Sequence, residues 1–266
     1  MKIAFIGGGN MGEAMLAAVL KKGLAKPETI IVSDIADPRR KLLARKYRVA
    51  VTGNNQQAVE IGDILVLAVK PQNLVEVMKE LKGYLKPSQL VLSIVAGAKT
   101  KTLARGLRHD SIVRAMPNTP AQVGEGISVW TATAGVSGQQ KEFVRAILGA
   151  MGKEVYVDNE KYIDMATAIS GSGPAYFFLM VEALVDAAVG IGLPRGKALE
   201  LVLQTMLGSG HLIQRSGKEP AELRQMVTSP GGTTAQALEQ FEKGGFAELV
   251  KRAVKAAYNR AKELGR

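Results

Sequence analysis

The sequence predicts an α/β protein with a doubly wound parallel sheet in its first part and only helices in its second part. Short apolar runs of strand length alternate with helical segments up to about residue 157, which is typical of a parallel sheet covered by helices. After about residue 158 the strand-like runs stop and helical patterns continue. We therefore expect one domain over residues 1–158 and another over residues 159–266.

Composition narrows the classes of protein that are possible. The chain has 266 residues, a formal net charge of +11 and no cysteine, which excludes disulfides, thiolate metal sites and cysteine nucleophiles and fits a cytoplasmic protein. Basic residues are scattered apart from residues 39–41 and aromatic residues are few, so we expect anionic small molecules rather than nucleic acid as partners. We expect no membrane span and no metal site, because no stretch looks long and uncharged enough and no cluster of metal ligands appears.

The stretch KIAFIGGGNMG at residues 2–12 combines a short apolar strand, a glycine turn and the start of a helix that continues over Glu13–Lys22. Gly7 permits a tight turn, Gly9 lets the backbone approach a pyrophosphate, and Gly12 lets the helix pack close to the strand. The helix start offers free N–H groups and a positive dipole end to phosphates. In this context the motif predicts a Rossmann-type dinucleotide site.

Further apolar runs supply the other strands of the sheet. We expect strands at residues 30–34, 49–51, 64–69, 90–95, 111–115, 126–131 and 154–157, with helices between most of them, as at residues 73–82 and 100–107. Continuous apolar runs are typical of buried parallel strands. Since ligands bind beyond the carboxyl ends of such strands, we expect Gly8, Asp34, Lys70 and Ala96 on one rim, joined by the turn at residues 117–120.

Asp34 lies where a dinucleotide fold places the residue that meets the adenine ribose. A carboxylate there binds the 2′-hydroxyl of NAD and repels the 2′-phosphate of NADP. Arg39 and Arg40 follow at the next helix start, where either could hold that phosphate or both could lie on a solvated helix face. These residues therefore leave both NAD and NADP possible as the cofactor.

The helix expected over Ala175–Gly190 is apolar on nearly all sides and must be buried on all sides. A domain of about 100 residues can hardly enclose it, so we expect an oligomer interface, with a core helix of a monomer as the alternative. Before it, residues 170–174 are expected to break one helix and start another. Further helices are expected over residues 195–214, from Pro220, and over residues 235–243 and 246–265.

A second glycine-rich helix start, residues 229–234, carries two threonine hydroxyls and can bind a carboxylate, although threonine is also a common helix cap. His109 and His211 both look structural, and Ser172 lacks a placed base. The chemistry is therefore expected to come from the cofactor, by hydride transfer to a substrate that accepts hydride readily.

Five motifs carry a resemblance to a known family. They are FIGGGNMG at residues 5–12, AVKP at 68–71, RAMPNTP at 114–120, SGSGPAY at 170–176 and SPGGTT at 229–234. In this order and spacing the chain resembles the pyrroline-5-carboxylate reductases along essentially its whole length. The resemblance implies reduction of 1-pyrroline-5-carboxylate to L-proline with NADPH or NADH. It also implies a Rossmann domain followed by a helical dimerisation domain, with homodimers that assemble further, often as decamers.

The resemblance also implies roles for individual residues. The pyrophosphate would be held by Ile6, Gly7, Gly8, Gly9, Asn10 and Met11, the adenosine would be flanked by Asp34 and Asn55, and the dinucleotide would be lined by Ala68, Val69, Lys70, Pro71, Ile94, Val95 and Ala96. Gly232, Thr233 and Thr234 would bind the substrate carboxylate, with Thr234 donating toward the ring nitrogen. Many members have serine or a neutral residue where this chain has Asp34, which leaves the choice between NADP and NAD open.

Two other functions stay in view. A reductase of the β-hydroxyacid dehydrogenase type would need a lysine base after the domain boundary, and Lys161 is the only nearby candidate. A regulatory protein that senses NAD(H) without turnover would not need a second anion site, so Thr233 and Thr234 argue against it.

Overall fold

The computed structural model describes residues 1–265, which divide into two compact units. Unit 1 comprises Met1–Ser172 together with the C-terminal segment from Ala257, and unit 2 comprises Gly173–Ala256. The last strand of the sheet ends at Tyr156, near the boundary expected at residue 158. The limits 1–158 and 159–266 for the two functional domains stay a prediction.

Unit 1 is built on one eight-stranded sheet with the order β3-β2-β1-β4-β5-β6-β7-β8. The strands are β1 (Ile3–Ile6), β2 (Ile30–Ser33), β3 (Ala50–Thr52), β4 (Ile64–Leu67), β5 (Leu90–Ser93), β6 (Ile112–Met116), β7 (Gly126–Ala132) and β8 (Gly152–Tyr156). All neighbours pair in parallel except β6 and β7. The doubly wound α/β prediction is confirmed, and the strand order reverses at β1, between β2 and β4.

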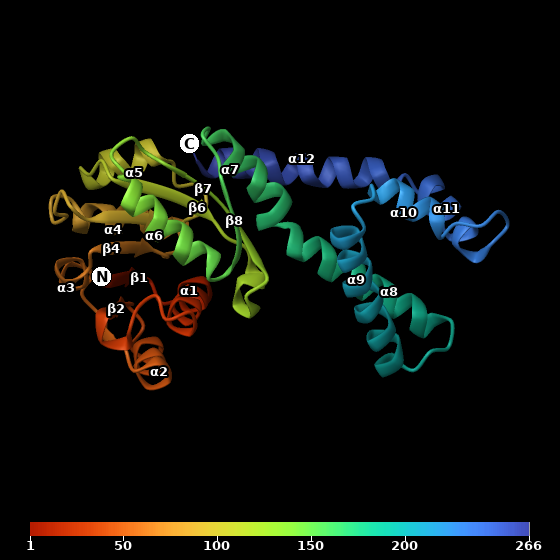
Figure 1. Ribbon diagram of the computed structural model, residues 1–266, viewed down its shortest axis with the longest axis horizontal. Helices are drawn as coiled ribbons and strands as arrows, with labels where there is room; N and C mark the ends of the chain where they lie inside the picture. The colour runs from red at the N-terminus through yellow and green to blue at the C-terminus, as the bar shows by residue number, and fades with distance from the viewer. Residues whose placement is uncertain (266) are drawn as a thin grey trace. The chain divides into compact units, whose positions relative to one another are not determined.

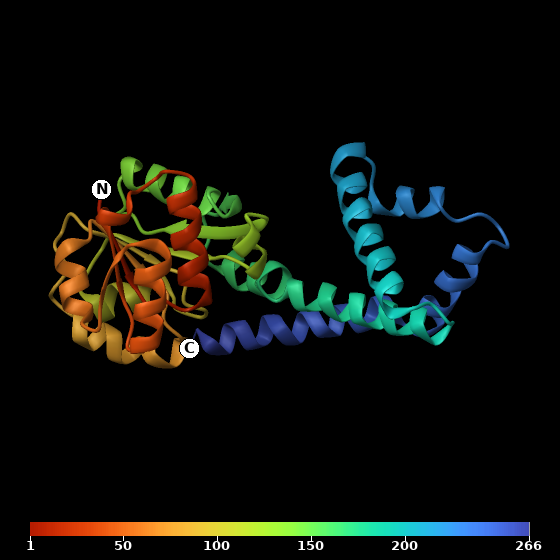
Figure 2. The same cartoon turned by 90° about the horizontal axis from the view of Figure 1, so that it is seen from below.

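Helices cover both faces of this sheet (Figure 1, Figure 2). Unit 1 contains α1 (Asn10–Lys21), η1 (Pro27–Thr29), α2 (Asp37–Tyr47), α3 (Asn55–Ile61), η2 (Pro71–Asn73), α4 (Leu74–Leu81), α5 (Thr100–Leu107), η3 (Thr119–Val123), α6 (Gly138–Gly149), α7 (Lys161–Ala166) and the π-helical η4 (Thr167–Gly171). Successive strand residues point to opposite faces. Ile3 and Phe5 thus join the core beneath α1, α2 and α6, whereas Ala4 and Ile6 join the core beneath α3, α4 and α5.

As expected, one helix ends and another begins within residues 170–174: η4 ends at Gly171, Ser172 is a bend, and α8 begins at Gly173 with Pro174 in its first turn. The π turn η4 follows α7 directly, and the Ser172 N–H donates to the Thr167 carbonyl at 2.8 Å. A π turn widens the helix and so relieves the clash that the ring of Pro174 would otherwise make with the carbonyl four residues earlier. The resulting helical stretch Lys161–Gly190 is, by length and composition alone, apolar enough to cross a membrane, so the expectation that no such stretch exists was wrong.

Unit 2 contains only helices and loops among its described residues. It holds α8 (Gly173–Gly190), α9 (Arg195–Ser216), α10 (Pro220–Met226), α11 (Thr233–Lys243) and the first part of α12 (Phe246–Leu264). Only Gly173 and Val185 of α8 are buried, and the side chain of Leu179 is 65% exposed. In the single chain α8 is therefore no core helix, which argues against the monomer alternative.

Candidate active site

The predicted dinucleotide residues lie along one edge of the sheet in unit 1, where the parallel strands end. Ile6 ends β1, Gly7, Gly8 and Gly9 form the loop after it, Asn10 and Met11 begin α1, Asp34 follows β2, Asn55 begins α3, Ala68, Val69, Lys70 and Pro71 follow β4, and Ile94, Val95 and Ala96 follow β5. Backbone hydrogen bonds join neighbouring loops: the Gly7 N–H donates to the Ser33 carbonyl at 2.8 Å, and the Ala68 N–H donates to the Ile6 carbonyl at 2.9 Å.

Two glycines of the motif are required by the protein itself. Gly7 has a φ of +102°, and a Cβ on it would lie 2.7 Å from the carbonyl oxygen of Ala68. A Cβ on Gly12 would lie 2.6 Å from the carbonyl oxygen of Gly7. These positions let the loop turn tightly and let α1 pack against the end of β1.

Gly9 is different, because neither its backbone nor its packing requires glycine. Its φ is −65°, which any residue adopts, and no described atom outside its own neighbourhood lies within 4 Å of the position of a Cβ. Gly9 is also the N-cap of α1 and offers no side chain to the first N–H groups of that helix, which have no partner within the helix. The open space and the free donors fit a diphosphate group.

Asp34 is bound to the glycine loop. Its Oδ2 accepts from the Gly8 N–H at 2.8 Å and its Oδ1 accepts from the Ala36 N–H at 2.9 Å. The carboxylate therefore fixes the loop against the end of β2, at the corner where an adenosine ribose would meet it.

Both arginines that follow are tied to the protein rather than spread on a solvated helix face. Arg39 donates to the Gly8 carbonyl and to the carboxylate of Glu13. Arg40 donates to the carbonyl oxygen of Asp34 at 2.7 Å and to that of Ile35 at 3.0 Å.

Glu13, in the first turn of α1, binds three side chains of α2 and was missed by the sequence analysis. Its carboxylate accepts from Lys46 at 2.9 Å, from Tyr47 at 2.8 Å and from Arg39. Burial by itself would raise the pKa of Glu13, but the hydrogen bonds from Lys46, Tyr47 and Arg39 outweigh it and lower the pKa to about 2. The partners stand 26 to 34 positions away, so no local spacing could reveal them.

The side chain of Asn55 is committed to other parts of unit 1. Its Oδ1 accepts from the Ser33 hydroxyl at 2.7 Å, and its Nδ2 donates to Glu80 at 2.7 Å. Asn55 therefore holds α3 and α4 at the end of β2, beside the corner where Asp34 lies.

The three residues expected to bind substrate lie together at the start of α11, in unit 2. Gly232 is the N-cap, and Thr233 and Thr234 are the first two residues of the helix. The N-cap makes no side-chain hydrogen bond, so neither threonine caps α11 and the first N–H groups are left without a partner within the helix. This helix start can accept an anion, with two hydroxyls beside the N–H groups. The dinucleotide residues, by contrast, all belong to unit 1.

The other titratable candidates do not form an acid–base site. His109 is buried, and its Nε2 lies 2.7 Å from the carbonyl oxygen of Gln89, as a structural histidine would. His211 is exposed on α9. Lys161 is exposed at the start of α7, with its Nζ 5.2 Å from the ring centroid of Tyr162.

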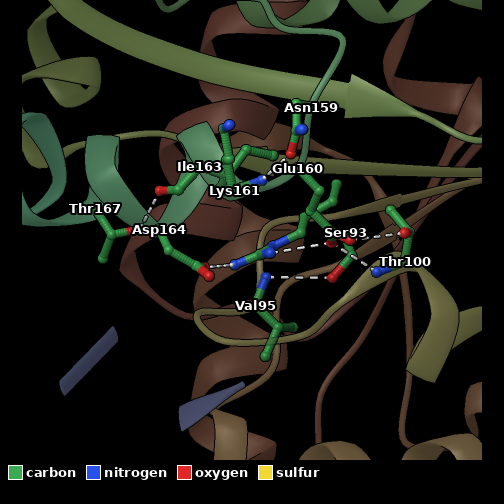
Figure 3. Close-up of polar contacts among 10 residues, drawn as sticks. Ser93, Val95, Thr100, Asn159, Glu160, Lys161, Ile163, Asp164 and Thr167 are labelled. Carbon is green, nitrogen blue, oxygen red and sulfur yellow. Dashed lines mark hydrogen bonds and ion pairs between the residues drawn. The ribbon is translucent and has the colours of Figure 1, made fainter. Parts of the chain in front are cut away.

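Sequence reasoning also missed a buried ion pair of unit 1, in which Arg114 of β6 binds Glu160 and Asp164 near the start of α7 (Figure 3). A signal was present, because an arginine inside the buried strand IVRAM needs acidic partners. Their identity was hidden, since they lie 46 and 50 positions further along.

Comparison with known proteins identifies the family. The family model described as pyrroline-5-carboxylate reductase dimerisation matches residues 160–264, and one described as NADP oxidoreductase, coenzyme F420-dependent, matches residues 2–97. The pyrroline-5-carboxylate reductase of Synechocystis sp. is 43% identical over 266 residues, which is 100% of this chain and 99% of the relative.

Solved structures agree with this match. A pyrroline-5-carboxylate reductase from Coxiella burnetii has a TM-score of 0.90 at 40% identity and covers 100% of this chain and 98% of its own. Pyrroline carboxylate reductase from Plasmodium falciparum, crystallised with NADP bound, has a TM-score of 0.92 at 34% identity with the same coverage. The glycine loop, the order of the sheet and the likeness over the whole chain all agree with this match. The chain belongs to the pyrroline-5-carboxylate reductase family.

Proposed function

We propose that this protein reduces the C=N bond of 1-pyrroline-5-carboxylate to give L-proline, with NADPH or NADH as hydride donor. One observation carries the proposal beyond family membership: the space beside Gly9 is open although neither backbone nor packing requires glycine there. A diphosphate at the start of α1 explains that opening.

The dinucleotide would be held along the strand ends of unit 1. The pyrophosphate would be bound by Ile6, Gly7, Gly8, Gly9, Asn10 and Met11. The adenosine would be flanked by Asp34 and Asn55, and the rest of the dinucleotide would be lined by Ala68, Val69, Lys70, Pro71, Ile94, Val95 and Ala96. When bound, the reduced nicotinamide supplies the hydride. The chain's own part is to hold and orient it.

The substrate carboxylate is assigned to Gly232, Thr233 and Thr234. The free N–H groups at the start of α11 and the two hydroxyls suit an anion. The Thr234 hydroxyl is proposed to donate a hydrogen bond to the ring nitrogen. Because a cyclic imine can arrive already protonated at nitrogen, a strong general acid is unnecessary, which agrees with the structural role of His109 and the exposure of His211.

The family's dimerisation segment, residues 160–264, supports a homodimer, and we propose further assembly into a larger oligomer such as a decamer. We also propose a cytoplasmic location and functional domains over residues 1–158 and 159–266. The apolar helix α8 is then covered by another copy of the chain rather than by lipid.

One assay tests this function. Absorbance of the reduced nicotinamide is followed with 1-pyrroline-5-carboxylate, and in the reverse sense with 3-hydroxyacids and oxidised cofactor. We expect turnover with the imine only. Thr234→Ala should lower kcat about 10- to 1000-fold, less than the usual contribution of a general acid because the imine can arrive already protonated, with NADH affinity close to wild type. His211→Ala is the matched control and should retain most activity.

Turnover of 3-hydroxyacids alone would favour a β-hydroxyacid dehydrogenase. Cofactor binding without any turnover would favour a regulatory protein. Full activity of Thr234→Ala would show that the proton donor has been assigned to the wrong helix.

A further inference from the structure

A buried arginine connects β6 with the start of α7. Arg114 is only 2% exposed, and its Nη1 donates to Glu160 Oε1 at 3.0 Å while its Nη2 donates to Asp164 Oδ1 at 2.6 Å (Figure 3). A buried guanidinium needs such partners, because an uncompensated charge in the core is costly. Two carboxylates thus share one guanidinium, which is more than the simplest pairing requires.

Glu160 also binds the start of α5. The Thr100 N–H donates to Glu160 Oε1 at 2.8 Å and the Thr100 hydroxyl donates to Oε2 at 3.0 Å. Thr100 is the first residue of α5, and Lys99 at the N-cap makes no side-chain hydrogen bond. A carboxylate at a helix start satisfies a free N–H group and the helix dipole. Glu160 is thus the cap of α5, brought from 60 positions away.

The loop fixed by this cap is the one proposed to line the dinucleotide. We call residues 94–99, between β5 and α5, the β5 loop; it contains Ile94, Val95 and Ala96. At its first end the Ile94 N–H donates to the Leu67 carbonyl at 3.0 Å. At its other end the loop is followed directly by Thr100, whose N–H donates to the carboxylate of Glu160.

The last turn of α12 closes the β5 loop from another side, still within unit 1. Gly97 has a φ of +76°, and a Cβ on it would lie 2.5 Å from the carbonyl oxygen of Leu264. Glu160 and Leu264 both belong to the segment matched by the dimerisation model, residues 160–264. The dimerisation segment therefore lies against the β5 loop at Gly97 and binds Thr100, the residue that directly follows the loop.

We propose that Glu160 is a positioning residue for the dinucleotide, which holds the β5 loop by capping α5 while Arg114 fixes its carboxylate. The proposal rests on the dinucleotide site of the proposed function. Asp164 supplies an internal comparison, because it binds the same arginine but, among the described contacts, Thr100 is bound by Glu160 and not by Asp164.

The test is a titration of the purified full-length protein with NADH, followed by nicotinamide fluorescence. Glu160→Gln should weaken NADH binding about 5- to 30-fold, because the neutral amide keeps one acceptor for Thr100 but loses the charge and the second acceptor, whereas Asp164→Asn should change it less than about 2-fold. In turnover assays Glu160→Gln should raise the KM for NADH and leave the KM for the imine near wild type. Thr100→Val, which removes only the hydroxyl donor, should weaken NADH binding about 2- to 5-fold with the ion pair intact.

Gly9→Val in the same titration tests the dinucleotide site separately from the positioning role of Glu160. If Gly9→Val abolishes NADH binding while Glu160→Gln and Asp164→Asn bind alike, the positioning role is wrong and the dinucleotide site stands. If Gly9→Val binds NADH like wild type, the dinucleotide site is wrong and the role of Glu160 falls with it. Equal losses in Glu160→Gln and Asp164→Asn would show that the acids serve only to hold Arg114.

Discussion

The fold of the protein does not require glycine at position 9, whereas a bound diphosphate would require it. Its φ of −65° suits any side chain, and a Cβ there would meet no described atom outside its neighbourhood. Gly9→Val should therefore fold normally and lose NAD(P)H affinity by at least about 30-fold, because the side chain would occupy the space of the pyrophosphate. Calorimetric titration measures this. Gly138→Val, at another helix start with open space, is the control; unchanged affinity in a folded Gly9→Val would contradict the site.

We propose that Asp34 determines whether the site for the adenine ribose accepts a 2′-phosphate. Asp34→Ser removes a charge that repels the 2′-phosphate and should shift the ratio of kcat/KM values toward NADPH, by roughly 1–3 kcal/mol for one partly solvated charge. Asp34 also accepts hydrogen bonds from Gly8 and Ala36, so Asp34→Asn, which keeps an acceptor, should shift the ratio in the same direction. A ratio that does not move in either variant would place Asp34 away from the ribose.

Glu13 should make stability depend on acid. Its pKa of about 2 in the folded protein lies below the ordinary 4.5, so its contribution is present above pH 4.5 and is lost as the pH falls toward 2. Between pH 5 and pH 2 the wild type should lose about 1–2 kcal/mol more of its unfolding free energy than Glu13→Gln, after allowance for screening by solvent. Urea unfolding at several pH values measures the difference. Parallel pH profiles would contradict it, and Glu28→Gln, at an exposed glutamate, should follow the wild type.

At the residue scale, sequence alone could place the glycines but not the side chains that hold them. The spacing of Gly7, Gly9 and Gly12 is local and carries its own meaning. The partners of Asp34, Glu13 and Arg114 become visible only when strands and helices far apart in the chain meet, because nothing in local spacing selects one acid or base among many.

At the scale of elements, α8 presents an apolar surface that the single chain leaves uncovered. Phe177, Phe178 and Leu179 are 63%, 61% and 65% exposed. Leu179→Glu should disrupt the oligomer, because a charge would be buried at the interface. Light scattering should find the wild type as an oligomer and the variant smaller, with Leu42→Glu on α2 as a control that assembles normally. A monomeric wild type at micromolar concentration would refute the interface.

Strands were predictable from sequence because a parallel strand buried on both faces is a continuous apolar run, as at Ile64–Leu67. Residues 170–174 correctly predicted the point at which one helix ends and α8 begins, since glycine, serine and proline usually end a helix. The π turn η4 just before that point was not predicted, because its backbone pattern leaves no periodic mark in the sequence.

At the scale of the whole molecule, the predicted dinucleotide residues belong to unit 1, and the family's dimerisation model matches residues 160–264, most of which form unit 2. The doubly wound sheet and the helical second part were predicted from apolar runs and helical patterns in the sequence, whereas the order of the strands was not. The contact of Glu160 with Thr100 and the approach of Leu264 to Gly97 could not be predicted from sequence, because they join positions far apart in the chain. We propose that these contacts give the dimerisation segment a part in holding the cofactor.

The central claim is that hydride passes from the nicotinamide to the imine carbon of 1-pyrroline-5-carboxylate. Isotope transfer tests it most directly: the protein is incubated with the imine and with NADH or NADPH deuterated at both C4 positions, and the product is analysed by mass spectrometry and NMR. The account predicts L-proline that carries one deuterium at C5. Formation of no proline, or of proline without the label, would contradict it.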